Sequence, residues 1–187
     1  MEYITADNDS ELVKHYEEAL VLAKNADCDE AQYGAVIFKD GKVLGTGYNH
    51  VPEEIKGAYT CVNCPRKSFE LHGGVGLELC VTVHAEEAAV DDMLITRHVP
   101  KEDSEAATIV IGKFKNGVVH VIHRMKPYCT KCSGRIFNAT LIGSVVLLVE
   151  DTGPTKRFAS FTRQEFHELS FADLKENYAK TIREKGT

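Results

Sequence analysis

Apolar residues recur every three or four positions near the start of the chain, at Leu12, Tyr16, Leu20 and Ala23. This spacing places them on one face of a helix, and we expect that face to pack against a sheet. Asp9 or Ser10 can cap the helix through a side-chain oxygen, and the helix is predicted to run to about Asn25.

Short apolar segments rich in β-branched residues follow, and they predict strands at residues 33–39, 42–48, 108–112, 118–122 and 144–149. Asp40-Gly41 lies between the first two segments and is a strong hairpin signal. Gly45 and Gly47 in the return strand indicate that another part of the backbone approaches closely there. The last segment is almost wholly apolar, as expected for a strand that is covered on both faces.

Two shorter helices are predicted in the second half of the chain, one from His84 to about Arg97 and one from Cys129 to about Asn138. Near the end of the chain, Thr162-Arg163-Gln164-Glu165 is a capping-box pattern that begins a helical tail. Its last residues, 180–187, are expected to fray.

The order of these elements predicts a three-layer α/β/α sandwich with a central mixed sheet. Hydrophobic residues make up 43% of the 187 positions, which is enough for one sizeable core. We therefore expect residues 1–187 to form a single domain, with a helical C-terminal extension from about residue 153.

Composition and charge exclude some classes of binding partner. The net charge is −6, whereas a general nucleic-acid binder carries a basic stripe, so no nucleic-acid partner is expected. No apolar run approaches the roughly 20 residues that span a bilayer, so no membrane partner is expected, and the N-terminus lacks a signal-peptide pattern. Six cysteines without a secretion signal indicate a reducing, cytoplasmic location, where paired cysteines more often bind metal than form disulfides.

The candidate chemistry lies in two short motifs, His84-x-Glu86 and Cys129-x-x-Cys132, each at the start of a predicted helix. One imidazole and two thiolates supply three ligands for Zn²⁺ and leave a fourth position open, which is typical of a catalytic zinc. Glu86 would then be available to transfer protons. Either motif alone has ordinary explanations: a surface His-x-Glu, or a Cys-x-x-Cys that is structural or redox-active. Together, in this order, they form the pattern of zinc nucleobase deaminases.

A second group of cysteines, Cys28, Cys61, Cys64 and Cys80, is left over. Four thiolates would close a structural zinc site and fasten the long segment between residues 49 and 80 to the domain. Two alternatives remain open. Cys28 and Cys80 can be buried thiols, or His50 or His72 can replace one of the four ligands.

These motifs resemble the cytidine/deoxycytidylate deaminase superfamily, and most closely the zinc-dependent dCMP deaminases. The resemblance rests on five segments in the family's order: residues 33–37, 47–49, 78–80, 84–86 and 129–132. It implies that Asn49 hydrogen-bonds the substrate's sugar, that Ala85 offers its backbone near the base, that Cys28 matches a second-zinc position of some members, and that the chain forms a homo-oligomer. Three positions depart from the family pattern: Tyr128 separates Pro127 from Cys129, His50 replaces a frequent glycine, and Ala88 replaces a frequent asparagine.

The sequence therefore predicts a zinc-dependent hydrolase whose partner is a small nucleotide, with dCMP converted to dUMP and ammonia. The alternatives are a deaminase of another nucleobase substrate (polynucleotide cytosine or adenine, a purine base, or an antibiotic or flavin precursor) and a zinc-stabilised binding module without activity. Tyr128, next to a zinc ligand, either stacks on the base or packs as an ordinary aromatic. Arg66-Lys67 and His72-Gly73-Gly74 either bind a 5′-phosphate or form a solvated loop.

Overall fold

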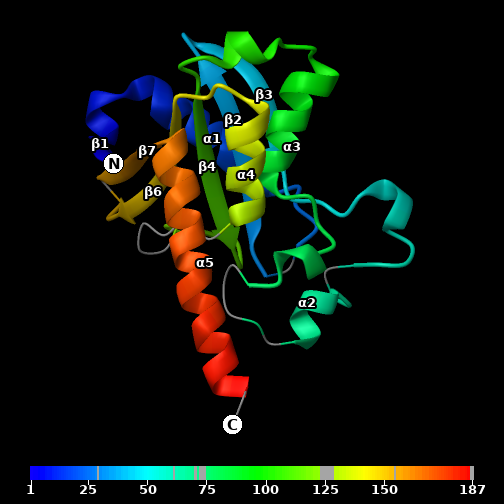
Figure 1. Ribbon diagram of the computed structural model, residues 1–187. Helices are drawn as coiled ribbons and strands as arrows, with labels where there is room; N and C mark the ends of the chain where they lie inside the picture. Colours follow the sequence, from blue (N-terminus) through cyan, green and yellow to red (C-terminus); the bar gives the residue numbers. More distant parts are fainter. Residues whose placement is uncertain are drawn as a thin grey trace.

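The chain forms one mixed β-sheet with helices on both faces (Figure 1). The structure, a computed structural model, describes residues 1–28, 30–60, 62–69, 71, 75–122, 129–153 and 155–185. Its strands are β1 (Glu2–Thr5), β2 (Gln32–Lys39), β3 (Lys42–Tyr48), β4 (Thr108–Lys115), β5 (Val118–Val119), β6 (Ser144–Asp151) and β7 (Lys156–Thr162). Its α-helices are α1 (Ser10–Ala23), α2 (Pro65–Ser68), α3 (Ala85–Asp91), α4 (Thr130–Ala139) and α5 (Arg163–Lys185).

The strand order is β1-β7-β6-β4-β2-β3, and β5 pairs with β4. Strands β4 and β6 run parallel, with Ile111 opposite Leu147, and the other described pairs are antiparallel. The central mixed sheet of the predicted sandwich is therefore confirmed.

The β2–β3 hairpin turns at Asp40 and Gly41, both with positive φ (49° and 75°), as the Asp-Gly pair predicts. Gly47 in β3 faces α3 at very short range. A Cβ at this position would lie 2.4 Å from the backbone nitrogen of Ala89 and 2.5 Å from the carbonyl oxygen of Ala85. The predicted close backbone approach is thus confirmed, and it brings the start of α3 down onto the sheet.

Helix α1 covers one face of the sheet. The Asp9 side chain caps the helix by accepting a hydrogen bond from the backbone nitrogen of Leu12 at 2.8 Å. Leu12 and Tyr16 are fully buried against strand residues of this face, including Val110 and Phe158. The helix ends at Ala23, close to the predicted end.

Helices α3, α4 and α5 cover the opposite face, so the molecule has three layers, as predicted (Figure 1). Their apolar side chains pack on the inward residues of β2, β4 and β6, including Ile109 and Ile111. Helix α3 continues beyond Asp91 as a short π-helical segment, Asp92–Thr96, so the helical region ends close to the predicted Arg97. The remaining helical turns are 3₁₀ segments at Ala6–Asn8, Glu53–Ile55, Leu77–Leu79 and Lys101–Ser104.

The C-terminal part differs from the prediction of a helical extension from about residue 153. Residues 156–162 form β7, which lies between β1 and β6 and buries Phe158 and Phe161 in the domain. The helical part begins only at Arg163. Its capping box is confirmed, because the Thr162 backbone nitrogen donates to Glu165 Oε2 at 2.9 Å and the Glu165 nitrogen donates to Thr162 Oγ1 at 3.2 Å.

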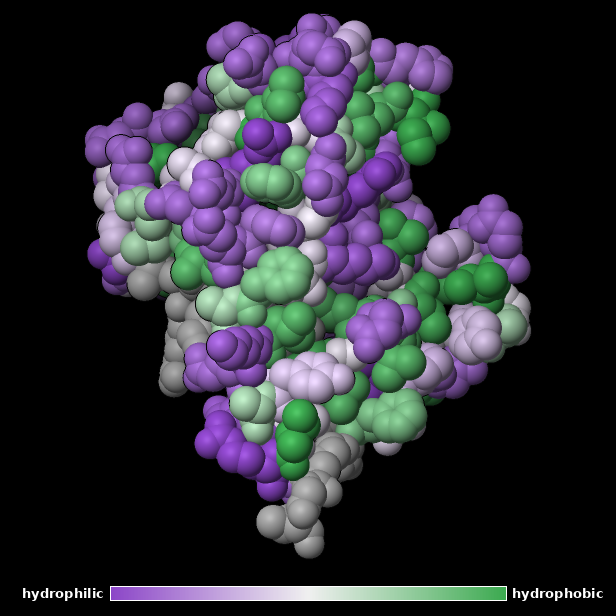
Figure 2. Space-filling view, viewed as in Figure 1, coloured by the Kyte–Doolittle hydropathy of each residue, from purple (hydrophilic) through white to green (hydrophobic). Residues whose placement is uncertain are grey.

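Helix α5 begins against α4 and its second half extends away from the sheet (Figure 1). It remains helical to Lys185, beyond the point where fraying was expected. Figure 2 shows hydrophobic side chains over the region of α2 and α5. Phe69, Phe171 and Tyr178 are about half exposed. Within the described ranges, no helix combines the length and the apolar content that crossing a membrane would require.

Candidate active site and metal centre

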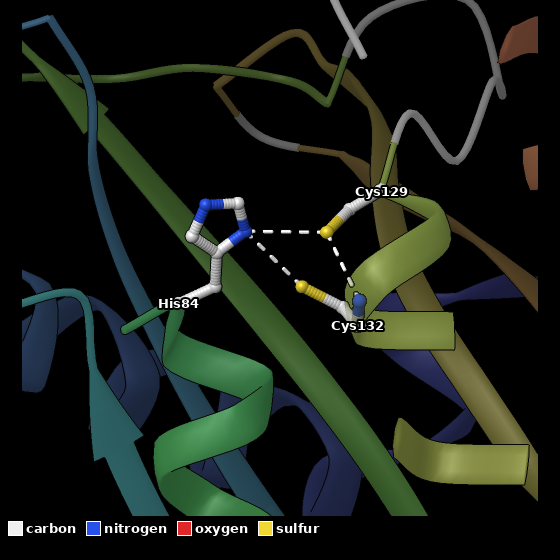
Figure 3. Close-up of side chains that lie close together, drawn as sticks. All are labelled: His84, Cys129 and Cys132. Carbon is white, nitrogen blue, oxygen red and sulfur yellow. Dashed lines mark hydrogen bonds between the residues drawn. The ribbon is translucent and has the colours of Figure 1, made fainter. Parts of the chain in front are cut away.

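Two helix N-termini meet over the sheet and carry the predicted zinc ligands. His84 is the N-cap residue of α3, and Cys129 is the N-cap residue of α4, with Cys132 one turn further on. Figure 3 shows the imidazole of His84 and both sulfur atoms pointing toward a common point between the two helices. Residues 45 and 48 positions apart in the sequence are therefore brought together, as the motifs predict.

The distances fit a zinc ion. His84 Nδ1 lies 3.2 Å from Cys129 Sγ and 3.2 Å from Cys132 Sγ. Tetrahedral zinc, with bonds of about 2.3 Å to sulfur and 2.0–2.1 Å to nitrogen, separates these atom types by roughly 3.5 Å. The three ligand atoms lie within 4.8 Å of one another, and they form the one such metal-ligating group among the described residues.

The three ligands differ in how readily they release the protons that a metal ion must displace. The hydrogen bond with Cys132 lowers the pKa of Cys129 to about 5; burial opposes this shift, and the nearby imidazole of His84 reinforces it. Burial raises the pKa of Cys132 well above its usual value. Burial alone would lower the pKa of His84, but the thiols of Cys129 and Cys80 outweigh it and raise that pKa to about 11. The protons held here are those that a zinc ion displaces when it binds.

Glu86 follows His84 by two residues and faces the same space without joining the ligand cluster. Glu86 is partly exposed and lines the cavity. Burial, followed by the negative charge of Cys129, raises the pKa of Glu86 to about 7. A carboxyl group poised near neutrality is suited to accept and return protons at physiological pH.

Glu87, the next residue, connects the two helices that carry the metal ligands. Its Oε2 accepts a hydrogen bond from the His84 backbone nitrogen at 3.3 Å and forms a 3.0 Å ion pair with Lys131 of α4. This pair links the two helices that carry the metal ligands. No local motif in the sequence indicates the pairing of Glu87 with Lys131.

A cavity of about 370 Å³ opens beside the metal-ligand cluster. Asn49 and Ala85, both predicted substrate contacts, line it and are almost fully buried. Asn49 Oδ1 accepts from the Tyr33 backbone nitrogen at 2.6 Å, and its Nδ2 donates to the Ala31 carbonyl at 3.0 Å. These bonds fix the amide while leaving one N–H and one lone pair for a ligand.

The second cysteine group is only partly covered by the described residues. Cys28 and Cys80 line the cavity, whereas Cys64 is buried with its Sγ 3.9 Å from the Leu79 carbonyl oxygen. These three do not form a metal-ligating group among the described residues. Cys61, like Tyr128, His72, Gly73 and Gly74, lies outside those residues, so a second zinc and a stacking role for Tyr128 stay predictions.

The structure adds cavity residues that the sequence did not single out. Thr82 contacts Cys80 at 3.1 Å between Oγ1 and Sγ. Burial raises the pKa of Cys80, but hydrogen bonds with His84 and Thr82 outweigh it and bring that pKa to about 6. Tyr33, Lys113 and Phe166 complete the wall. They converge through sheet register and helix docking, which no local motif encodes.

The fold and the site define a class of protein. Residues 9–149 match the family described as the cytidine and deoxycytidylate deaminase zinc-binding region. The chain therefore belongs to this family, and the His84, Cys129 and Cys132 cluster is its zinc site. It is a zinc-dependent hydrolase of the deaminase type.

Individual relatives narrow the comparison further. The deoxycytidylate deaminase of Mycobacterium phage D29 is 34% identical over 116 residues, which cover 56% of this chain and 87% of the phage protein. The deoxycytidylate deaminase of Schizosaccharomyces pombe is 36% identical over 76 residues, 40% of this chain and 23% of the yeast protein. Among solved structures, cytidine deaminase from Burkholderia pseudomallei superimposes with a TM-score of 0.50 at 17% identity, over 82% of this chain and 94% of that one, which supports the common fold.

Proposed function

We propose that this protein converts dCMP and water to dUMP and ammonia. The observation that carries the proposal is the placement of Glu86 on the wall of the cavity into which the zinc-ligand cluster opens. The deoxycytidylate deaminase of phage D29, similar over most of its own length, supports a deoxycytidylate substrate.

The zinc ligands and Glu86 have separate roles in the proposed reaction. His84, Cys129 and Cys132 would hold the zinc ion, which when bound would lower the pKa of a coordinated water molecule to about 7. Glu86 would accept a proton from water as the water oxygen bonds to C4 of the cytosine ring, and would donate that proton to N3. Glu86 then transfers the remaining proton to the departing amino group, which leaves as ammonia. The carboxylate ends the cycle as it began, as general acid–base catalysis requires.

Asn49 and Ala85 orient the substrate in this scheme. Asn49 is fixed by Tyr33 and Ala31, so its remaining N–H and lone pair are directed before the substrate arrives. Ala85 is fully buried at the first position of α3, between the metal ligand and the proton carrier. We assign the sugar contact to Asn49 and a backbone contact with the base to Ala85.

A panel of substrates tests this function. Zinc-loaded protein is incubated with dCMP, dCTP, deoxycytidine, cytosine and guanine, and ammonia release is measured for each. We expect dCMP to give the highest kcat/KM. Release of ammonia from guanine, or from a polynucleotide in a widened panel, but from no free cytosine compound would assign the site to another nucleobase. Absence of turnover with every compound would indicate a binding module.

We also retain the structural zinc site at Cys28, Cys61, Cys64 and Cys80 and the homo-oligomer as part of the proposal. Native mass spectrometry measures the number of zinc ions per chain and the number of chains per assembly in one experiment. Two zinc ions per chain in an assembly of several chains is the expected result, and one zinc ion per chain would remove the second site.

A further inference from the structure

Two cationic side chains, Arg66 and Lys113, line the cavity, although the chain as a whole carries a net charge of −6. Two carboxylates, Glu30 and Glu86, line it as well. Lys67 lies 3.4 Å from the Glu30 carboxylate and Lys115 lies 3.9 Å from it, so two lysines that do not line the cavity already pair with Glu30. Glu86 is the proposed proton carrier.

Lys113 reaches the cavity because of its register in the sheet. Alternate residues of a strand point to the same face, so Lys113 shares its face with Ile111, which also lines the cavity. It lies opposite Tyr33 of β2. The ammonium nitrogen of Lys113 lies 5.6 Å from the centre of the Tyr33 ring.

The ammonium group of Lys113 is half-buried and has no ion pair or hydrogen bond among the described residues. Burial, reinforced by the positive charge of Lys115, lowers the pKa of Lys113. Taking a cation out of water without an anionic partner costs free energy, and a ligand anion that binds there recovers it. The ring of Tyr33 offsets only part of that cost.

Lys24 makes a similar cation–π contact outside the cavity and serves as a comparison for Lys113. Its ammonium lies 5.7 Å from the centre of the Phe114 ring, nearly the same cation–π distance. Lys24 is exposed to solvent, however, and does not line the cavity. Among the lysines that the structure describes, only Lys113 combines the aromatic contact with partial burial in the wall of the active-site cavity.

We infer that Lys113, together with Arg66, binds the 5′-phosphate of the substrate and makes this enzyme selective for a mononucleotide over a nucleoside. The inference rests on the proposed deamination of dCMP and deepens it. Arg66 Nε donates to the Val75 carbonyl at 3.0 Å, and Arg66, like Lys113, lines the cavity. Tyr33 contacts both residues that are assigned to substrate binding: its ring contacts Lys113, and its backbone nitrogen donates to Asn49.

The test compares Lys113→Gln with Lys24→Gln, which removes the same charge and the same type of ring contact outside the cavity. Calorimetry gives the dissociation constants of dUMP and deoxyuridine for the zinc-loaded wild type and both variants. We expect Lys113→Gln to weaken dUMP binding about tenfold to a hundredfold, the effect of one hydrogen bond to a charged group, and to change deoxyuridine binding much less. Lys24→Gln should keep the wild-type ratio, and Lys113→Arg should restore most of it.

Kinetics with dCMP and deoxycytidine should show the same loss of selectivity in kcat/KM. A wild-type ratio retained in Lys113→Gln, or an equal loss for both ligands, would overturn the inference. Failure of the wild type to deaminate any cytosine compound would instead refute the proposed function. In that event a calorimetric titration with inorganic phosphate still decides the anion site, because binding that is unaffected by Lys113→Gln rules it out.

Discussion

The face of the sheet under α1 carries a cluster of buried apolar side chains, whereas the face under α3, α4 and α5 carries the active-site cavity. Under α1, the side chains of Leu12, Tyr16, Val110 and Phe158 pack together and are buried. On the opposite face the same strands contribute Ile111 and Leu147 both to a buried cluster and to the cavity wall. One set of strands thus supplies a structural face and a catalytic face.

Strand β4 shows how this division arises. Val110, Gly112 and Phe114 alternate with Ile109, Ile111 and Lys113 along the strand. Gly112 allows α1 to lie close, since a Cβ there would lie 2.9 Å from a methyl carbon of Leu20 and 3.0 Å from its nitrogen. Substitutions on the two faces should therefore have separable effects.

The largest effect is expected from Glu86→Gln on the catalytic face. The amide cannot accept the proton, so kcat should fall about a thousandfold, within the range of general acid–base catalysis. Bound zinc and the free energy of unfolding should change little, because Glu86 is not in the ligand cluster. Stopped assays of ammonia release and metal analysis of the same sample measure both quantities.

Glu87→Gln is the matched control for this prediction. It removes a neighbouring carboxylate of the same helix turn, one that pairs with Lys131 at 3.0 Å. Its kcat should fall less than about tenfold, with a loss of stability of about 1 kcal/mol, as for a partly exposed ion pair. If Glu87→Gln were the more damaging of the two for turnover, the assignment of the proton carrier would be wrong.

Two glycines on neighbouring strands sharpen the comparison of the faces. A Cβ at Gly34 would lie 1.9 Å from the carbonyl oxygen of Ala19 in α1, and one at Gly47 would lie 2.4 Å from the backbone nitrogen of Ala89 in α3. Each alanine substitution should lower the free energy of unfolding by about 1–3 kcal/mol, because a helix backbone must move. Only Gly47→Ala displaces the helix that carries Glu86, so only it should reduce kcat/KM per folded molecule, by about a hundredfold.

Urea unfolding gives the stabilities, and kcat/KM is normalised to the folded fraction at the assay temperature. Gly57→Ala serves as the neutral control, since a Cβ there meets nothing within 4 Å. Equal losses of kcat/KM in Gly34→Ala and Gly47→Ala would show that the two faces are not separable.

Much of the fold could be predicted because its signals are local. The cap at Asp9, the turn at Asp40-Gly41 and the capping box at Thr162 each depend on a few adjacent residues, and all three are present. Strands β1 and β7 were missed for a physical reason. The short β1 has two exposed and two partly exposed residues, and among the described strands it pairs with β7. The phenylalanines at 158, 161 and 166 have a spacing that also suits a helix.

The site residues likewise include some that local motifs predict and others that depend on long-range contacts. His84, Glu86, Cys129 and Cys132 were predictable because motif spacing and helix starts bring metal ligands together. Tyr33 and Lys113 were not, because their proximity depends on the register between β2 and β4. Register is set by the packing of both faces at once, so a single strand sequence does not reveal which residues will face each other.

The smallest change in stability is expected from Tyr16→Phe, on the face of the sheet under α1. The hydroxyl of Tyr16 is buried and has no hydrogen-bond partner among the described residues, while its ring contacts Phe158 edge-on at 5.2 Å. Phenylalanine keeps the ring contact and removes the unsatisfied group, so at pH 7 we expect a change of about 0–1 kcal/mol in favour of the variant.

The same substitution has a pH dependence of known sign. Burial, followed by the charge of Asp151, raises the pKa of Tyr16 in the folded state. The wild type therefore loses stability as the pH rises above about 10, where the unfolded tyrosine ionises and the folded one does not. Tyr16→Phe lacks this term, so its advantage should widen above pH 10 in urea unfolding, whereas Tyr178→Phe, at an exposed position of α5, should follow the wild type. A constant difference between pH 7 and pH 11 would mean that Tyr16 ionises as easily in the folded protein as in the unfolded chain.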